Sequence, residues 1–235
     1  MTPPAWLFDE RAHAGHEHLD PASVSIYDEK ARSDPTDDLT LLRRLSLDGS
    51  STLVDLGAGT GSFALAAASV CRKVVAVDIS QAMISTLKDR TRELALANVE
   101  IVEAGFLTYE HEGEPADFVY CRNALHHLPD VWKAVALQRA AALLRPGGVL
   151  RLRDLVYSFD PAEAGRVLSD WLDRATDRPE DGWTRSELEA HIRDEYSTFD
   201  WLLEPMLERA GFEVLESRYT DGVYAQFVCT TAGSG

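Results

Sequence analysis

The stretch LVDLGAGTGSF, residues 53–63, decides the fold. An apolar run ends in three glycines at alternate positions, Gly57, Gly59 and Gly61, and the carboxylate of Asp55 comes two residues before the first of them. Such a run predicts a buried strand that turns through a glycine-rich loop into a helix. Glycines there let the backbone approach a ligand closely and adopt positive φ angles. The stretch therefore predicts the first strand and the ligand-binding loop of an open α/β sheet.

The rest of the middle of the chain alternates between strand-like and helix-like segments. Strand-like segments follow at 73–80, 99–105, 116–123 and 149–157, and helix-like segments lie at 61–71, 80–96 and 130–144. This alternation is typical of βαβ units, which form parallel sheets. Near the C-terminus, Asp221 and Gly222 separate two apolar segments of alternating pattern and predict a β-hairpin. We expect a mostly parallel sheet with an antiparallel pair at one edge.

Two regions depart from this alternation. Residues 1–38 are polar and helix-like and contain four prolines, and residues 157–210 form an insertion rich in acids and aromatic residues. A chain of 235 residues fits one domain with such additions. We expect a helical N-terminal lid at 1–38, a core at 39–156, a helical insertion over the substrate site at 157–210 and a C-terminal hairpin at 211–235.

Charge and composition exclude several classes of partner. The chain has 39 acidic and 23 basic residues, a formal net charge of −16, and no Lys/Arg-rich block, so a nucleic acid is not an expected partner. No apolar segment is long enough to cross a membrane, and no signal-peptide pattern is present. Cys71, Cys121 and Cys229 lack metal-ligand or disulfide spacing, which favours a cytoplasmic location. The oligomeric state stays open, with a homodimer among the alternatives.

The spacing of the glycines separates two kinds of ligand. A dinucleotide-binding loop has the pattern GxGxxG, and its last glycine packs the helix against the sheet. The three glycines here give GxGxG, and Ser62 and Phe63 follow. The carboxylate of Asp55 suits an ammonium group or an amide better than a pyrophosphate, which binds where a helix N-terminus is free of negative charge. A nicotinamide-dependent oxidoreductase is therefore disfavoured.

Four successive motifs resemble those of the class I S-adenosylmethionine-dependent methyltransferases, in the small-molecule branch similar to the ubiquinone and menaquinone methyltransferases. They are VDLGAGTG (54–61), VVAVDIS (74–80), DFVYCRNALHHLPD (117–130) and LLRPGGVLRLRD (143–154). The resemblance implies an α/β fold with a Rossmann-like, seven-stranded, mostly parallel sheet, helices on both faces, an antiparallel C-terminal hairpin at one edge and a helical N-terminal lid. It also implies S-adenosylmethionine as the cofactor and a small-molecule methyl acceptor.

The resemblance further implies a role for individual residues. The glycine loop would lie against the methionine portion of the cofactor, Asp78 would bind the ribose hydroxyls, and Ile79 would pack on the adenine. The full cofactor set is Asp55, Gly57, Ala58, Gly59, Gly61, Asp78, Ile79, Gly105, Phe106, Cys121, Arg122 and Tyr27.

Some members of this set have a second interpretation. Arg122 could bind the cofactor carboxylate, bind an acidic substrate or remain a solvated arginine at a strand end, and Tyr27 could cover the cofactor or pack in the core. Gly105 stands where relatives usually carry an aspartate that binds the adenine amino group. Adenine recognition would then fall to backbone groups beside Phe106, or Glu103 would substitute.

Methyl transfer from a sulfonium is an in-line displacement that depends mainly on positioning. A general base is needed only if the acceptor atom arrives protonated. His126 follows the fourth strand and is the candidate base, although it could instead pack or cap the next helix. The same two alternatives hold for His127, for which the catalytic role is weaker.

Two other clusters carry weaker signals. His13, His16 and His18 lie close together, but no carboxylate or cysteine array completes a ligand set, so no metal site is expected. The insertion contains residues that could line an acceptor pocket. They are Trp171, Trp183, Glu195, Tyr196, Phe199 and Trp201.

Three other functions remain as alternatives. A protein of this resemblance could use S-adenosylmethionine in a cyclisation or bind it without chemistry. An oxidoreductase would bind NAD in preference to S-adenosylmethionine. A non-enzymatic interaction module would bind a basic partner through its acidic faces and would show no saturable small-molecule binding.

Overall fold

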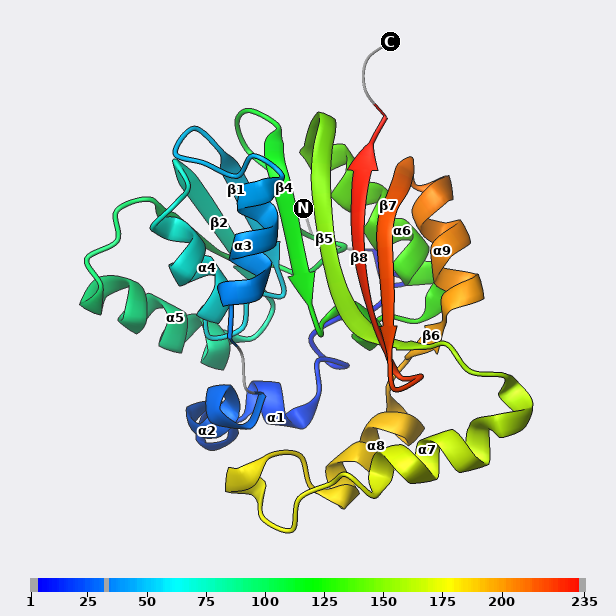
Figure 1. The fold of residues 1–235 in the computed structure, drawn as a ribbon. Helices are drawn as coiled ribbons and strands as arrows, with labels where there is room; N and C mark the ends of the chain where they lie inside the picture. Colours follow the sequence, from blue (N-terminus) through cyan, green and yellow to red (C-terminus); the bar gives the residue numbers. More distant parts are fainter. Residues whose placement is uncertain (1–3, 32–33, 233–235) are drawn as a thin grey trace.

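The structure, a computed structural model, describes residues 4–31 and 34–232 and is built on one eight-stranded sheet (Figure 1). The strand order is β3-β2-β1-β4-β5-β8-β7, and the short β6 pairs with the end of β5. The strands are β1 (Thr52–Leu56), β2 (Lys73–Asp78), β3 (Val99–Glu103), β4 (Ala116–Arg122), β5 (Leu144–Tyr157), β6 (Thr198–Phe199), β7 (Phe212–Thr220) and β8 (Tyr224–Thr231). Strands β1 to β5 pair in parallel, and β8 is antiparallel to both β5 and β7.

Helices cover both faces of the sheet and the end at which the parallel strands finish. They are α1 (His16–Leu19), α2 (Pro21–Ala31), α3 (Thr36–Arg44), α4 (Ser62–Ala68), α5 (Gln81–Glu93), α6 (Asp130–Leu143), α7 (Ala164–Leu172), α8 (Arg185–Asp194) and α9 (Asp200–Arg209). Figure 1 shows α3, α4 and α5 on one face and α6 and α9 on the other, while α1, α2, α7 and α8 gather beyond the carboxyl ends of the strands. Among the described residues, no helix combines the length and the apolar character needed to cross a membrane.

The expected fold class is confirmed, and the local signals explain why. Ser80 caps α5, because its hydroxyl accepts a hydrogen bond from the Met83 N–H at 3.2 Å. The C-terminal hairpin turns at Asp221 and Gly222, with φ angles of 59° and 75°, and pairs Thr220 with Tyr224. No sequence pattern predicts β6, because this strand has only two residues.

Two apolar clusters fill the two faces of the sheet. Along β1, Val54 and Leu56 belong to one cluster and Leu53 to the other, because successive side chains of a strand point to opposite faces. The first cluster packs against α6 and α9, where Leu203 and Leu207 are buried. Parallel strands buried on both faces are read as continuous apolar runs, which is the pattern of the first motif.

The N-terminal and inserted segments divide differently from the expected boundaries. Helix α3 crosses residue 38 and buries Leu42 in the second sheet cluster, whereas α1 and α2 lie beyond the sheet end. In the insertion, α9 covers the sheet, and only the part before it packs around a separate small cluster near the strand ends. Its buried members are Leu155, Val167, Trp171, Leu188 and Val223.

Candidate active site and cofactor cavity

The glycine loop connects β1 to α4 and has positive φ angles at all three glycines, 75°, 55° and 88°. A Cβ atom on Gly57 would lie 2.4 Å from the Cβ of Ala124, and one on Gly61 would lie 2.1 Å from Leu87. These two glycines therefore let the loop pack on its neighbours. Gly59 is different, since a Cβ there would meet only the Met83 sulfur at 3.9 Å, and Gly59 lines the cavity at the strand ends.

Asp55 lies under this loop with one carboxylate oxygen unsatisfied. Its Oδ2 is buried and has no hydrogen-bond partner among the described residues. Burial, and then the nearby charge of Asp78, raise the pKa of Asp55 to about 8. A buried carboxylate without a partner is costly, and a cationic ligand group beside it would remove that cost.

Arg122, at the end of β4, lines this cavity and also a smaller one beside it, which Asp55, Ala58 and Tyr27 line as well. Within residues 4–31 and 34–232 it forms no ion pair, although it is only partly exposed. The cavity thus presents a carboxylate and a guanidinium close together, which is a pair that suits the ammonium and the carboxylate of a free amino acid.

Asp78 ends β2 and sits at the middle of the cavity, followed on its wall by Ile79. Its Oδ2 accepts a hydrogen bond from the Gly59 N–H and its Oδ1 accepts one from the Ser80 N–H, each at 2.8 Å. Burial raises the pKa of Asp78, and the hydrogen bonds from the loop oppose that rise. Each oxygen keeps a lone pair for a hydroxyl donor.

The end of β3 corrects one of the sequence-based alternatives. Gly105 and Phe106 line the cavity, but Glu103 does not, because its exposed side chain forms an ion pair with Arg11 at 3.5 Å. The acid at this end is Glu10, whose oxygens accept hydrogen bonds from the backbone of the turn after Gly105. No local sequence pattern pointed to Glu10, since it lies far away in the chain.

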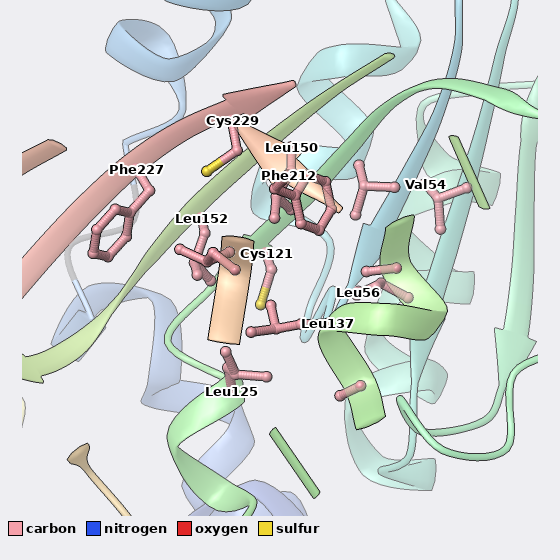
Figure 2. Close-up of a cluster of buried hydrophobic side chains, with 14 of the residues drawn as sticks. Val54, Leu56, Cys121, Leu125, Leu137, Leu150, Leu152, Phe212, Phe227 and Cys229 are labelled. Atoms are coloured by element: carbon pink, nitrogen blue, oxygen red, sulfur yellow. The ribbon is translucent and has the colours of Figure 1, made fainter. Parts of the chain in front are cut away.

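Cys121 also differs from its predicted place. Its thiol is buried in the apolar core of the sheet, next to Leu125, Leu137 and Leu152, and it does not line the cofactor cavity (Figure 2). The reason is the alternation of side chains along β4, which sends Cys121 to the face covered by α6. Gly61 is likewise absent from the cavity wall, because it packs against α5.

A second cavity of about 440 Å³ adjoins the first and lies between the strand ends, the N-terminal segment and α8. His18, Tyr27 and Asn123 line both cavities, so groups bound in the two would meet there. Trp171, Trp183 and Glu195 line the second cavity. Three other residues predicted there do not line it: Tyr196, Phe199 and Trp201. Phe199 and Trp201 stack on each other instead, with ring centres 5.4 Å apart.

His126 faces the second cavity and is held at both ring nitrogens. Nδ1 hydrogen-bonds to Asp154, whose other oxygen accepts the backbone N–H of His126 at 3.0 Å, and Nε2 lies 3.1 Å from Glu195 Oε2. Burial would lower the pKa of His126, but Asp154 and then Glu195 outweigh it and raise that pKa to about 9. Glu195 was predicted only as a residue of the acceptor pocket, and no sequence pattern indicates its contact with His126.

The neighbours of His126 complete a cluster of imidazoles around one carboxylate. His191, one helical turn before Glu195, forms an ion pair with it, and these contacts hold the pKa of Glu195 well below its usual value although burial opposes them. Burial, followed by the charge of His126, lowers the pKa of His127 well below its ordinary value. Donor atoms of His126, His127 and Glu195 lie within 4.8 Å of one another, a set that could hold a metal ion.

The N-terminal histidines whose side chains the structure describes, His13 and His18, each hydrogen-bond to a backbone carbonyl. His13 hydrogen-bonds to the carbonyl of Asp9 at 2.9 Å, and His18 hydrogen-bonds to the carbonyl of Ala14 at 2.7 Å. The side chain of His16 lies outside the described residues.

Comparison with known proteins identifies the family. A protein-family profile described as a methyltransferase domain matches residues 53–148. The trans-aconitate 2-methyltransferase of Methylobacterium radiotolerans is 32% identical over 225 residues, which covers 78% of this chain and 83% of that relative. The chain belongs to the class I S-adenosylmethionine-dependent methyltransferases.

One further relative and one solved structure are also similar to this chain. The 27-O-demethylrifamycin SV methyltransferase of Amycolatopsis mediterranei is 30% identical over 158 residues, 66% of this chain, and the chain spans 55% of that relative's length. The crystal structure of a SAM-dependent methyltransferase from Aquifex aeolicus has a TM-score of 0.63 at 18% identity, covering 91% of this chain and 99% of the other. The latter likeness concerns the fold.

S-adenosylmethionine is the cofactor of this methyltransferase, and the cavity residues fit it. The unsatisfied oxygen of Asp55 suits the ammonium group, and Arg122 suits the carboxylate. Asp78, with two acceptor oxygens, suits the pair of ribose hydroxyls. These groups follow one another along the ends of β1, β2 and β4, which are adjacent in the sheet.

Proposed function

We propose that this chain transfers a methyl group from S-adenosylmethionine to a small-molecule acceptor bound in the second cavity. The observation that carries the proposal is the junction of the two cavities at His18, Tyr27 and Asn123. A methyl group on one side of this junction lies next to an acceptor atom on the other, as an in-line displacement requires. Incubation with the cofactor and a panel of acceptors, followed by detection of S-adenosylhomocysteine, tests it.

The chain's contribution to the reaction is mainly positional. When bound, S-adenosylmethionine supplies a sulfonium-activated methyl group. Asp55 and Arg122 hold the amino-acid end, and Asp78 fixes the ribose, so that the reacting centre is oriented before the acceptor arrives. Tyr27 lines both cavities at their junction, where its ring would limit the access of water to the reacting centre.

The pair of His126 and Glu195 is proposed to take the proton of a hydroxyl or amine acceptor. The two groups lie 3.1 Å apart on the wall of the acceptor cavity, and Asp154 fixes the ring from its far side. With a pKa of about 9, His126 is mostly protonated at neutral pH. The deprotonated form that acts as a base therefore grows as the pH approaches 9.

The lining of the second cavity favours an acceptor with an apolar or aromatic body. Its walls carry Trp171, Trp183 and Tyr224, and its acids are Glu187, Asp194 and Glu195. No lysine or arginine of the described residues lines it. Among the substrates named for the relatives, the 27-O-demethylrifamycin type of hydroxylated acceptor fits this lining better than trans-aconitate does.

Chemistry other than methyl transfer is the alternative that the acceptor screen addresses. A cyclase or a protein that only binds the cofactor would bind S-adenosylmethionine saturably and yield no S-adenosylhomocysteine with any acceptor. Detection of a methylated product would exclude both.

The proposal also covers the cellular location, the partners and the oligomeric state of the enzyme. Three free, buried cysteines suit a reducing cytoplasm, and the net charge of −16 disfavours nucleic acid as the acceptor. A homodimer is the oligomeric state to test first, by light scattering during gel filtration. Activity with free small molecules and none with nucleic acid is the expected result.

A further inference from the structure

The turn after β3 is closed by the carboxylate of Glu10, which belongs to the N-terminal segment. Glu10 Oε1 accepts a hydrogen bond from the Phe106 N–H at 2.7 Å, and Oε2 accepts one from the Leu107 N–H at 3.0 Å. Glu10 is buried, with 8% of its surface exposed, and lines the cofactor cavity beyond Asp78. An acid from the N-terminal segment is thus built into the wall of this cavity.

Gly105 is matched to Glu10. A Cβ atom on Gly105 would lie 2.3–2.5 Å from the carboxylate atoms of Glu10, closer than any side chain permits. A side chain at residue 105 and the carboxylate of Glu10 therefore compete for the same space. In this chain the carboxylate of Glu10 occupies that space, and residue 105 is a glycine.

The segment that carries Glu10 is anchored on both sides of this contact. Arg11 forms the ion pair with Glu103 at the end of β3, and Trp6 stacks on Trp132 of α6, with ring centres 6.3 Å apart. Further along, the hydroxyl of Ser80 donates a hydrogen bond to the carbonyl of His18. These contacts hold the backbone around Glu10 in place, and its carboxylate is thereby fixed at the cavity wall.

The chemistry of this end of the cavity selects a hydrogen-bond donor. An ionised carboxylate only accepts hydrogen bonds, and each oxygen of Glu10 has one bond from the backbone and a lone pair to spare. A purine with an amino group at position 6 donates there, whereas a purine with a carbonyl group at that position would place two acceptors together. A site that hydrogen-bonds one group rejects the analogue that lacks it.

We propose that Glu10 recognises the exocyclic amino group of the cofactor's adenine, and that the N-terminal segment is thereby a wall of the cofactor site. The inference rests on the proposed function only for the identity of the cofactor. Selectivity for the adenine base then depends on Glu10, and Gly105 at the end of β3 leaves the space that Glu10 needs.

Binding of S-adenosylhomocysteine and of its inosine counterpart, S-inosylhomocysteine, measured by calorimetry, tests the proposal. A charged hydrogen bond of 1.5–3 kcal/mol corresponds to a preference of about 10- to 150-fold for the adenine compound in the wild-type chain. Glu10→Gln should reduce this preference to within about threefold, because an amide can present either a donor or an acceptor. A role limited to closing the turn would weaken both ligands equally and would leave the preference intact, which would overturn the proposal.

Because residues 10 and 105 compete for the same space, substitutions at both positions provide a second test. Glu10→Ala should weaken S-adenosylhomocysteine binding by about 10-fold or more, and Gly105→Asp alone should also weaken it, because the new carboxylate collides with Glu10. In the variant that combines both substitutions, the carboxylate introduced at position 105 has the space that Glu10 occupied, so binding and base preference should recover most of the loss. Additive losses in this double variant would count against the proposal.

Two controls keep the outcomes separate. Glu100→Gln changes an exposed acid of β3 that pairs with Lys73 and does not line the cavity, and it should leave both dissociation constants unchanged. Thermal unfolding of each variant reports whether the turn still forms. Failure of the wild-type chain to bind S-adenosylhomocysteine would refute the proposed function, whereas binding without base preference would refute only the role of Glu10.

Discussion

The two cavities that meet at His18, Tyr27 and Asn123 are built in different ways. The cofactor cavity is formed mainly by the ends of adjacent parallel strands, whose backbone hydrogen bonds fix Asp55 and Asp78 on a rigid sheet. The acceptor cavity is formed by helices from two distant segments, which a few side-chain contacts hold together. We infer that cofactor binding depends on the sheet, whereas acceptor selection depends on how the N-terminal segment and the insertion pack against each other.

Among the described residues, polar and aromatic contacts join the two segments that form the acceptor cavity. Lys30 of α2 pairs with Glu187 of α8 and lies over the ring of Trp183, 4.7 Å from its centre. Asp28 of the same helix binds Arg90 and the hydroxyl of Thr60 at the cofactor loop. Changes at Lys30 and Glu187 should alter acceptor binding more than cofactor binding, and changes at the sheet should do the reverse.

The largest expected effect is on turnover in the His126→Asn variant. Asparagine keeps a donor near Asp154 and removes the Nε2 atom, so kcat should fall by about 10²- to 10⁴-fold with an acceptor that must lose a proton. The dissociation constant for S-adenosylhomocysteine should not change, because His126 does not line the cofactor cavity. Steady-state kinetics and calorimetry check both statements, and an unchanged kcat would remove His126 from the mechanism.

A smaller effect is expected at the sheet in the Asp55→Asn variant. Loss of the charged partner of the ammonium group should weaken S-adenosylhomocysteine binding by about 10- to 150-fold. Stability should change in the opposite direction. The folded state binds more protons at Asp55 between pH 3.8 and about 8, so its contribution falls as the pH rises through that window. The variant should therefore gain most in stability, by denaturant unfolding, near pH 8.

The pH dependence of turnover separates His126 from the rest of the site. The kcat of the wild-type chain should rise with pH towards an apparent pKa of about 9, as His126 loses its proton. Glu195→Gln removes an anion that favours the protonated ring, so the midpoint should move to lower pH. Over the same range the stability due to His126, fully present below pH 6.5, should be lost as the pH passes 9. A flat profile in both proteins would contradict the assignment.

The smallest expected effect tests the contact between the two segments. Lys30→Met keeps the aliphatic stem and removes the pair with Glu187, a contact between a buried and a partly exposed group. Partly exposed pairs contribute about 0.2–1 kcal/mol, so KM for the acceptor should rise by about 1.4- to 5-fold. Binding of S-adenosylhomocysteine should stay the same. Equal losses for both ligands would show that the two cavities are not independent.

The same contrast explains what the sequence could predict. The strands, the glycine loop, the cap at Ser80 and the acids Asp55 and Asp78 follow from patterns within a few neighbouring residues, and the structure has them where these patterns indicate. Such features depend on local backbone geometry and on the alternation of a strand. Sequence alone is enough to find them because their partners are close in the chain.

Features that depend on distant partners were missed or misplaced. Glu10 closes a turn 96 residues away in the chain, and Glu195 reaches His126 from the end of α8. The resemblance to the methyltransferase family placed Cys121 in the cofactor site, but the pleat of β4 turns its thiol into the core. Glu103 was considered for the adenine, whereas its side chain points to Arg11.

The central claim is that the unsatisfied carboxylate of Asp55 beneath the glycine loop binds the ammonium end of the cofactor. Calorimetric titration of the purified chain with S-adenosylhomocysteine from pH 6 to pH 8, in buffers of different ionisation heat, tests it most directly. The account predicts saturable binding that releases a proton below pH 8 and weakens by about tenfold for each unit of lower pH, with both effects lost in Asp55→Asn. Absence of binding, or binding whose proton release survives that substitution, would contradict it.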